Sequence, residues 1–78
     1  MPEGIEHFRA TFKNGDQDFA YAKEVYAAAR QMLMRKENFN KTITEMHINI
    51  SSYHRPVWKK ISFSREKIFM NKKQKERR

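Results

Sequence analysis

The alternation of apolar and polar residues predicts a strand near the start of the chain. Between Ile5 and Lys13, the side chains of Phe8, Ala10 and Phe12 share one side, and the residues between them are polar. A period of two over this length is typical of a strand with one buried face. The Asn-Gly-Asp sequence at positions 14–16 then predicts a tight turn, because Asn and Gly tolerate positive φ and Asp accepts hydrogen bonds from nearby backbone N–H groups.

A helical period follows between about Asp18 and Glu37. Apolar residues recur there at a spacing of three to four, and the segment contains no Gly or Pro. We expect one long helix, capped at its N-terminus by Asp16 or Asp18 and closed by Asn38 or Asn40. Its apolar face would consist of Phe19, Ala22, Val25, Tyr26, Ala29, Met32 and Leu33.

Two further strands are predicted in the second half of the chain. The segment from Thr42 to Ser51 alternates, with Met46, Ile48 and Ile50 on one side and with Ile43, Glu45, His47 and Asn49 on the other. The segment from Val57 to Ser64 also alternates and predicts a third strand, hairpinned to the second. Beyond Ser64 the apolar residues are consecutive and form no stripe, so we expect a short helix or a disordered tail.

These elements predict an α+β fold. It is a small β-α-β-β domain over residues 1–64, with one long helix packed on a three-stranded sheet, followed by a basic C-terminal extension over residues 65–78. A right-handed crossover from the first strand to the second would place the helix on one face of the sheet and leave the other face open. Because a 78-residue chain has a small core, a homodimer or another partner could cover that open face.

Composition narrows the possible classes of protein. The chain has no cysteine, which excludes disulfides and thiolate metal sites. It has no run of about 20 apolar residues that could span a membrane, and its N-terminus lacks the pattern of a signal peptide. We therefore expect a cytoplasmic, intracellular protein that is not secreted and does not span a membrane.

Positive charge is concentrated at the C-terminal end. The chain has a net charge of +8, and the segment from Arg55 to Arg78 carries ten of the seventeen Lys and Arg residues but only two of the nine acids. The first 54 residues are neutral in sum. Such a block predicts a polyanionic or acidic partner rather than a generally basic surface.

Aromatic and basic residues interleave from Tyr53 to Lys60, in the connection before the third predicted strand and in its first residues, and a basic tail follows that strand. Rings that stack on bases, next to cations that neutralise phosphates, are typical of surfaces that bind single-stranded nucleic acid. A flexible cationic tail binds phosphate backbones without fixed geometry. The alternatives are that Trp58 seals the core, that Tyr53 caps the hairpin and that the tail only aids solubility. The predicted binding residues are Tyr53, His54, Arg55, Trp58, Lys59, Lys60, Arg65, Lys67, Lys72, Lys73, Lys75, Arg77 and Arg78.

The histidines give weaker signals. His7 and His47 have outward positions on the first two predicted strands, near Arg9 and Glu45 if these strands are neighbours. Two histidines without a third ligand make a poor metal site. His54 could act as a general base in RNA cleavage, but no catalytic motif supports this role. We therefore predict no catalytic residue, metal ion or cofactor.

The leading hypothesis is a small nucleic-acid-binding accessory protein that prefers RNA or single strands. The alternative is a protein-interaction module, such as an inhibitor or regulator that docks its basic end on an acidic surface of a larger protein. A small ribonuclease and a binder of anionic membrane surfaces are further alternatives without a specific signature.

Overall fold

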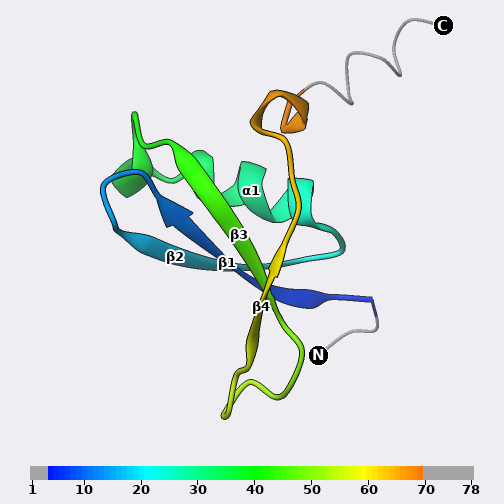
Figure 1. Ribbon diagram of the computed structural model, residues 1–78. Coiled ribbons are helices and arrows are strands. Elements are labelled where there is room, and N and C mark those ends of the chain that lie inside the picture. Colours follow the sequence, from blue (N-terminus) through cyan, green and yellow to red (C-terminus); the bar gives the residue numbers. More distant parts are fainter. Residues whose placement is uncertain (1–3, 70–78) are drawn as a thin grey trace, which may run out of the picture.

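Four antiparallel strands form one sheet in the computed structural model, which describes residues 4–69 (Figure 1). The order of strands across the sheet is β2-β1-β3-β4. The elements along the chain are β1 (Glu6–Phe12), β2 (Gln17–Ala22), α1 (Val25–Leu33), the 3₁₀ turn η1 (Lys36–Asn38), β3 (Ile43–Asn49), β4 (Trp58–Ile61) and the 3₁₀ turn η2 (Arg65–Lys67).

The hairpin between β1 and β2 confirms the predicted first strand and turn but shortens the predicted helix. Asn14 Oδ1 accepts a hydrogen bond from the backbone N–H of Asp16 at 3.0 Å, and Gly15 has a φ of +95°. The residues after the turn pair with β1 instead of starting a helix. The prediction of a helix from Asp18 to Glu37 was therefore wrong over its first part, because strand pairing outweighs the local helix propensity of the segment.

Helix α1 begins after Glu24, whose carboxylate accepts hydrogen bonds from the backbone N–H groups of Tyr26 and Ala27 at 2.9 and 3.0 Å. Glu24 thus replaces the predicted caps Asp16 and Asp18, which lie in the β1–β2 turn and in β2. The helix ends at Leu33. Asn40, one of the two residues expected to close the helix, has a φ of 66°, but it follows η1 and does not close α1.

The topology also differs from the predicted one. The sheet has four strands rather than three, and β1 pairs with β3 in the antiparallel sense, so no right-handed crossover joins them. The extra strand β2 reverses the chain direction before α1 and makes the antiparallel pairing possible. The α+β class, with one helix on one face of the sheet and the other face open, is confirmed (Figure 1).

Small residues line the contact between the helix and the sheet. Ala28 and Ala29 of α1 and Ala10, Ala20 and Ala22 of the sheet are all buried, which lets the two layers approach closely. Larger side chains fill the rest of the core, namely Phe8, Phe12, Met32, Ile43, Met46 and Ile68.

An irregularity in the β1–β3 pairing changes the predicted faces of β3. The register shifts between Thr11 and Phe12, so Ile43 and Met46 both reach the core, with exposed fractions of 1% and 0%. A bulge places two residues against one and therefore breaks strict alternation. The prediction that Ile43 lies opposite Met46 was wrong for this reason. Ile50, expected on the apolar side, lies beyond the end of β3 and is exposed.

The segment after β4 packs back on α1. The predicted third strand is confirmed as β4, hairpinned to β3. The hydroxyl of Tyr26 accepts a hydrogen bond from Ser64 N at 3.0 Å, and Arg30 Nη1 donates to the carbonyl of Ile68 at 2.7 Å. Within residues 4–69, no helix is long and apolar enough to cross a membrane.

Candidate functional site

The face of the sheet opposite α1, hereafter the open face, carries two rows of side chains that cross the strands. In the first row, Phe19 of β2 lies beside Arg9 of β1, followed by His47 of β3 and Lys60 of β4. In the second row, one step further along the strands, the order is Tyr21, His7, Asn49 and Trp58. The first row carries Arg9 and Lys60 next to the ring of Phe19, and the second row consists mainly of rings.

His7 is the centre of a group of rings. It stacks on Tyr21, with ring centroids 4.6 Å apart and an interplanar angle of 6°, and meets Trp58 edge-on at 4.9 Å. Phe19 lies 5.7 Å from Trp58, and Tyr53 of the β3–β4 loop lies 5.6 Å from His7. We call these five residues, His7, Phe19, Tyr21, Tyr53 and Trp58, the aromatic cluster.

The aromatic cluster is open to solvent. Phe19, Tyr21 and Tyr53 are 43%, 36% and 63% exposed. The five rings, together with His54 and Pro56, line an open depression of about 570 Å³. Exposed apolar groups gathered on one surface of a small protein are typical of a binding site, whereas single exposed apolar residues are ordinary.

Positive groups border the cluster. The guanidinium carbon of Arg9 lies 4.9 Å from the centre of the Trp58 ring, a distance that permits a cation–π contact. Lys60 is exposed, and its Nζ lies 3.6 Å from the carboxylate of Glu45. The Nε atom of Arg9 and the Nδ1 atom of His47 are buried and have no hydrogen-bond partner among residues 4–69. A buried polar atom without a partner carries an energetic cost.

Asn49 fixes the loop that carries Tyr53. Its Oδ1 accepts hydrogen bonds from the backbone N–H groups of Ser51 at 2.9 Å and Val57 at 3.1 Å, and its Nδ2 donates to the carbonyl of Ser52 at 3.0 Å. Asn49 is 8% exposed. The side chain therefore holds both ends of the β3–β4 loop against the sheet.

The same amide determines which ring nitrogen of neutral His7 carries the proton. Because Oδ1 accepts from two backbone N–H groups, Nδ2 of Asn49 must face His7 Nδ1, 3.1 Å away. Nδ1 then accepts the hydrogen bond, and the proton of the neutral ring is on Nε2. Burial lowers the pKa of His7, in agreement with a neutral ring that stacks on Tyr21.

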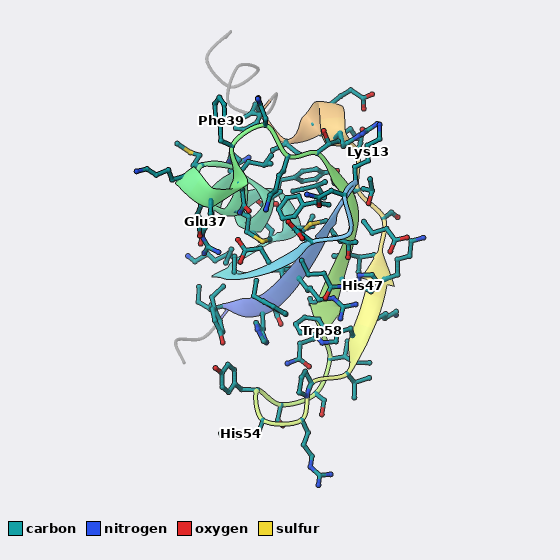
Figure 2. All side chains as sticks on the ribbon, turned by 90° about the vertical axis from the view of Figure 1, so that its left-hand side faces the viewer. Lys13, Glu37, Phe39, His47, His54 and Trp58 are labelled. Atoms are coloured by element: carbon teal, nitrogen blue, oxygen red, sulfur yellow. The ribbon has the colours of Figure 1, made fainter. Side chains whose placement is uncertain are left out.

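The structure brings only some of the predicted binding residues together. Figure 2 shows Trp58 and His47 in the same part of the sheet and His54 in the β3–β4 loop next to it. Tyr53, His54 and Arg55 lie in that loop, while Trp58 and Lys60 lie on the open face.

The remaining predicted residues lie elsewhere. Lys59 points to the side of the helix, and η2, with Arg65 and Lys67, follows the end of β4 away from the loop (Figure 1). The predicted residues Lys72, Lys73, Lys75, Arg77 and Arg78 lie outside the described residues.

Sequence reasoning missed two rings of the site. Phe19 was assigned to the apolar face of a helix, and Tyr21 was given no role, although both lie on the open face of β2. The sequence did contain a signal for this strand, because Phe19 and Tyr21 alternate with Ala20 and Ala22 soon after the Asn-Gly-Asp turn sequence. His7, considered only for proton transfer or as a weak metal ligand, is the centre of the aromatic cluster. Within residues 4–69, no group of three or more His, Cys, Asp or Glu residues could hold a metal ion.

Comparison with known protein families, curated proteins and solved structures finds no match for this chain. The inference of function therefore rests on the geometry and chemistry of the open face.

Proposed function

We propose that the protein binds single-stranded nucleic acid on the open face of its sheet. Bases stack on the aromatic cluster, and cations beside it neutralise phosphates. The observation that carries this proposal is the juxtaposition of the two rows, in which exposed rings lie one step along the strands from Arg9 and Lys60. Stacking on aromatic side chains next to a positive groove is the common way in which proteins bind single strands without reading sequence.

The charges around the depression favour an anionic aromatic ligand over a cationic one. Clusters of rings also bind quaternary ammonium groups. Among the described residues, no carboxylate lines the depression, and Arg9 already holds a cation against Trp58. Arg55 in the adjoining loop adds a further positive charge. A second cation would therefore be repelled, whereas a nucleobase with its phosphate is attracted.

Single strands fit the open face better than duplexes do. Sequence-specific duplex binding usually places a helix or a β-ribbon in the major groove. The helix α1 is packed against the sheet through Ala28 and Ala29. The rings of the open face can stack only on bases that are unpaired and turned outward.

The first test is binding of labelled oligonucleotides of about 12 nucleotides, with oligo(U), oligo(dT) and a duplex as separate ligands. The full-length chain is first freed of bound nucleic acid. We expect both single strands to bind more tightly than the duplex and to quench the fluorescence of Trp58, the only tryptophan of the chain. Equal affinity for the duplex, or binding without any change in Trp58 fluorescence, would exclude base stacking on this face.

Substitution of an exposed ring provides the matched comparison. Phe19→Ala removes a ring of the aromatic cluster, whereas Phe39→Ala removes an equally apolar ring that is 77% exposed at the other end of the molecule (Figure 2). One stacked base contributes about 1–3 kcal/mol, so Phe19→Ala should weaken binding about 5- to 150-fold. Phe39→Ala should leave the affinity unchanged. Equal effects of both substitutions would contradict the proposed site.

The salt dependence tests the cationic row. If Arg9, Arg55 and Lys60 each neutralise one phosphate of a single strand, they add about −2 to the slope of log affinity against log salt concentration. Lys60→Ala should reduce the magnitude of the slope by about 0.7. Lys36→Ala, at an exposed position of η1, is the control and should not change the slope.

A further inference from the structure

The two edges of the sheet differ in how their backbone groups are used. On the β2 edge, Gln31 Nε2 donates to the carbonyl of Tyr21 at 2.9 Å, and Arg35 Nη1 donates to the carbonyl of Phe19 at 2.9 Å. The N–H of Phe19 donates to the carboxylate of Asp18 at 2.8 Å. Side chains thus occupy the N–H of Phe19 and the carbonyls of Phe19 and Tyr21, so the β2 edge is closed to another strand over this stretch.

The β4 edge has no such protection from the part of the chain that the structure describes. The N–H of Ile50 donates to the carbonyl of Val57 at 2.9 Å, which fixes the phase of hydrogen bonding between β3 and β4. Because bonding alternates along an antiparallel pair, Lys59 bonds to β3, and the N–H and C=O groups of Trp58 and Lys60 point outward. Within residues 4–69, no side chain forms a hydrogen bond with these outward groups.

The chemistry of the β4 edge selects the kind of strand that could pair with it. Lys59 and Lys60 are exposed on opposite faces of β4, and Arg55 precedes them. Lysines on an edge oppose pairing with a second copy, since lysines would then face lysines. The same lysines complement an acidic strand on both faces. Charge complementarity therefore indicates one occupant, an extended acidic segment of another protein.

We infer that β4 binds an extended acidic segment of a partner protein by strand addition, which would make it a fifth strand of the sheet. Backbone hydrogen bonds to Trp58 and Lys60 provide the attachment, and Lys59 and Lys60 select acidic side chains. This interaction goes beyond the proposed binding of nucleic acid, because it uses the backbone of an edge rather than the rings of the open face.

The test uses full-length, isotope-labelled protein without nucleic acid and two synthetic peptides of about eight residues, the length of an ordinary strand. One peptide alternates Glu and Thr, and the other alternates Lys and Thr. We expect the acidic peptide to bind at least tenfold more tightly and to protect the amides of Trp58 and Lys60 from hydrogen exchange. Equal affinity of the two peptides, or protection restricted to β2, would overturn the inference.

The backbone contribution is separated from the charge by two substitutions at one position. Lys60→Ala removes the charge and keeps the outward N–H, whereas Lys60→Pro removes both without removing a hydrogen bond to β3. We expect Lys60→Pro to bind the acidic peptide at least fivefold more weakly than Lys60→Ala does. Equal binding by the two variants would show attraction by charge alone and would overturn strand addition.

A modified peptide keeps the test decisive if Lys60→Pro fails to fold. Methylation of the peptide nitrogens along one edge of the acidic peptide removes its hydrogen-bond donors but keeps its charge. The wild-type protein should bind the methylated peptide at least tenfold more weakly, and unchanged binding would overturn the inference. Protection of Trp58 and Lys60 that rises with protein concentration alone would identify a second copy as the occupant and would also overturn it.

Discussion

Asn49→Asp is a substitution that should reverse the sign of the contribution that His7 makes to the pH dependence of stability. The introduced carboxylate can still accept the hydrogen bonds from Ser51 N and Val57 N. Its second oxygen, however, replaces the Nδ2 donor that faces His7 Nδ1 at 3.1 Å. An oxygen at that place attracts a proton to Nδ1, so the substitution changes which charge state of His7 the folded protein favours.

The sign of the effect follows from the pKa of His7. In the wild type the folded-state pKa lies below the ordinary value of 6.5, so the contribution of His7 to stability is complete above pH 6.5 and is lost as the pH falls below it. In Asn49→Asp the nearby carboxylate raises the pKa of His7 above that value. The contribution is then present below pH 6.5 and is lost as the pH rises through the folded-state pKa.

The expected change in the free energy of unfolding of Asn49→Asp has two parts. At pH 7.5 the variant should be about 1–3 kcal/mol less stable, because the carbonyl of Ser52 loses its donor, which lay at 3.0 Å, and meets an oxygen instead. One unit of pKa separation corresponds to about 1.4 kcal/mol. Because water screens the partly exposed His7 ring, we expect this deficit to shrink by only about 1 kcal/mol between pH 7.5 and pH 5.5.

Urea denaturation at several pH values measures both parts, and an NMR titration of the three histidines gives the pKa of His7 directly. A double variant, His7→Gln with Asn49→Asp, should lose the pH-dependent part and keep the constant deficit. The reasoning would be refuted by a wild-type His7 pKa above 6.5, or by a deficit of the single variant that does not change with pH.

Three further predictions concern the fold. Asp18→Asn should cost about 1–3 kcal/mol in urea denaturation, because Asp18 binds Arg35 at 2.9 Å and Asn38 at 2.7 Å. Burial alone would raise the pKa of Asp18, but hydrogen bonds from Asn38, Phe19 N and Arg35 lower it overall. The wild type should therefore lose stability as the pH drops below about 3.8, and the variant should lose less. Gly15→Ala should cost about 1 kcal/mol in a thermal melt, because a φ of +95° strains any residue with a Cβ. Ile68→Ala should cost about 2–5 kcal/mol in urea denaturation, because Ile68 is 3% exposed, and a smaller loss would contradict its place in the core.

The sequence predicts three of the four strands because their apolar and polar residues contrast strongly. Phe8, Ala10 and Phe12 alternate with polar neighbours, and only the core side is apolar. In β2 the contrast is inverted, since the buried residues are the small Ala20 and Ala22 and the exposed ones are large rings. A prediction that places large apolar residues in the core therefore puts Phe19 inside and favours a helix for this segment. Pairing with β1, which no local pattern contains, decides the outcome.

The candidate site was predictable only where it is local in sequence. Tyr53, Trp58 and Lys60 lie close together in the chain, and their mixture of rings and cations suffices to select them. His7 joins them only through the pairing of β1 with β3. The closed β2 edge likewise depends on Gln31, which lies ten residues beyond the carbonyl that it binds.

The inverted pattern of β2 also bears on function. A slip of one residue in its pairing would bury Phe19 and Tyr21 and expose Ala20 and Ala22. The closely packed α1 leaves room only for small side chains on that face, so the register places Ala20 and Ala22 inside and Phe19 and Tyr21 outside. Packing alone explains the small residues inside, but it does not require large rings on the exposed side, where polar residues are usual. A binding role for the aromatic cluster gives a physical reason for the exposed rings beside Arg9 and Trp58.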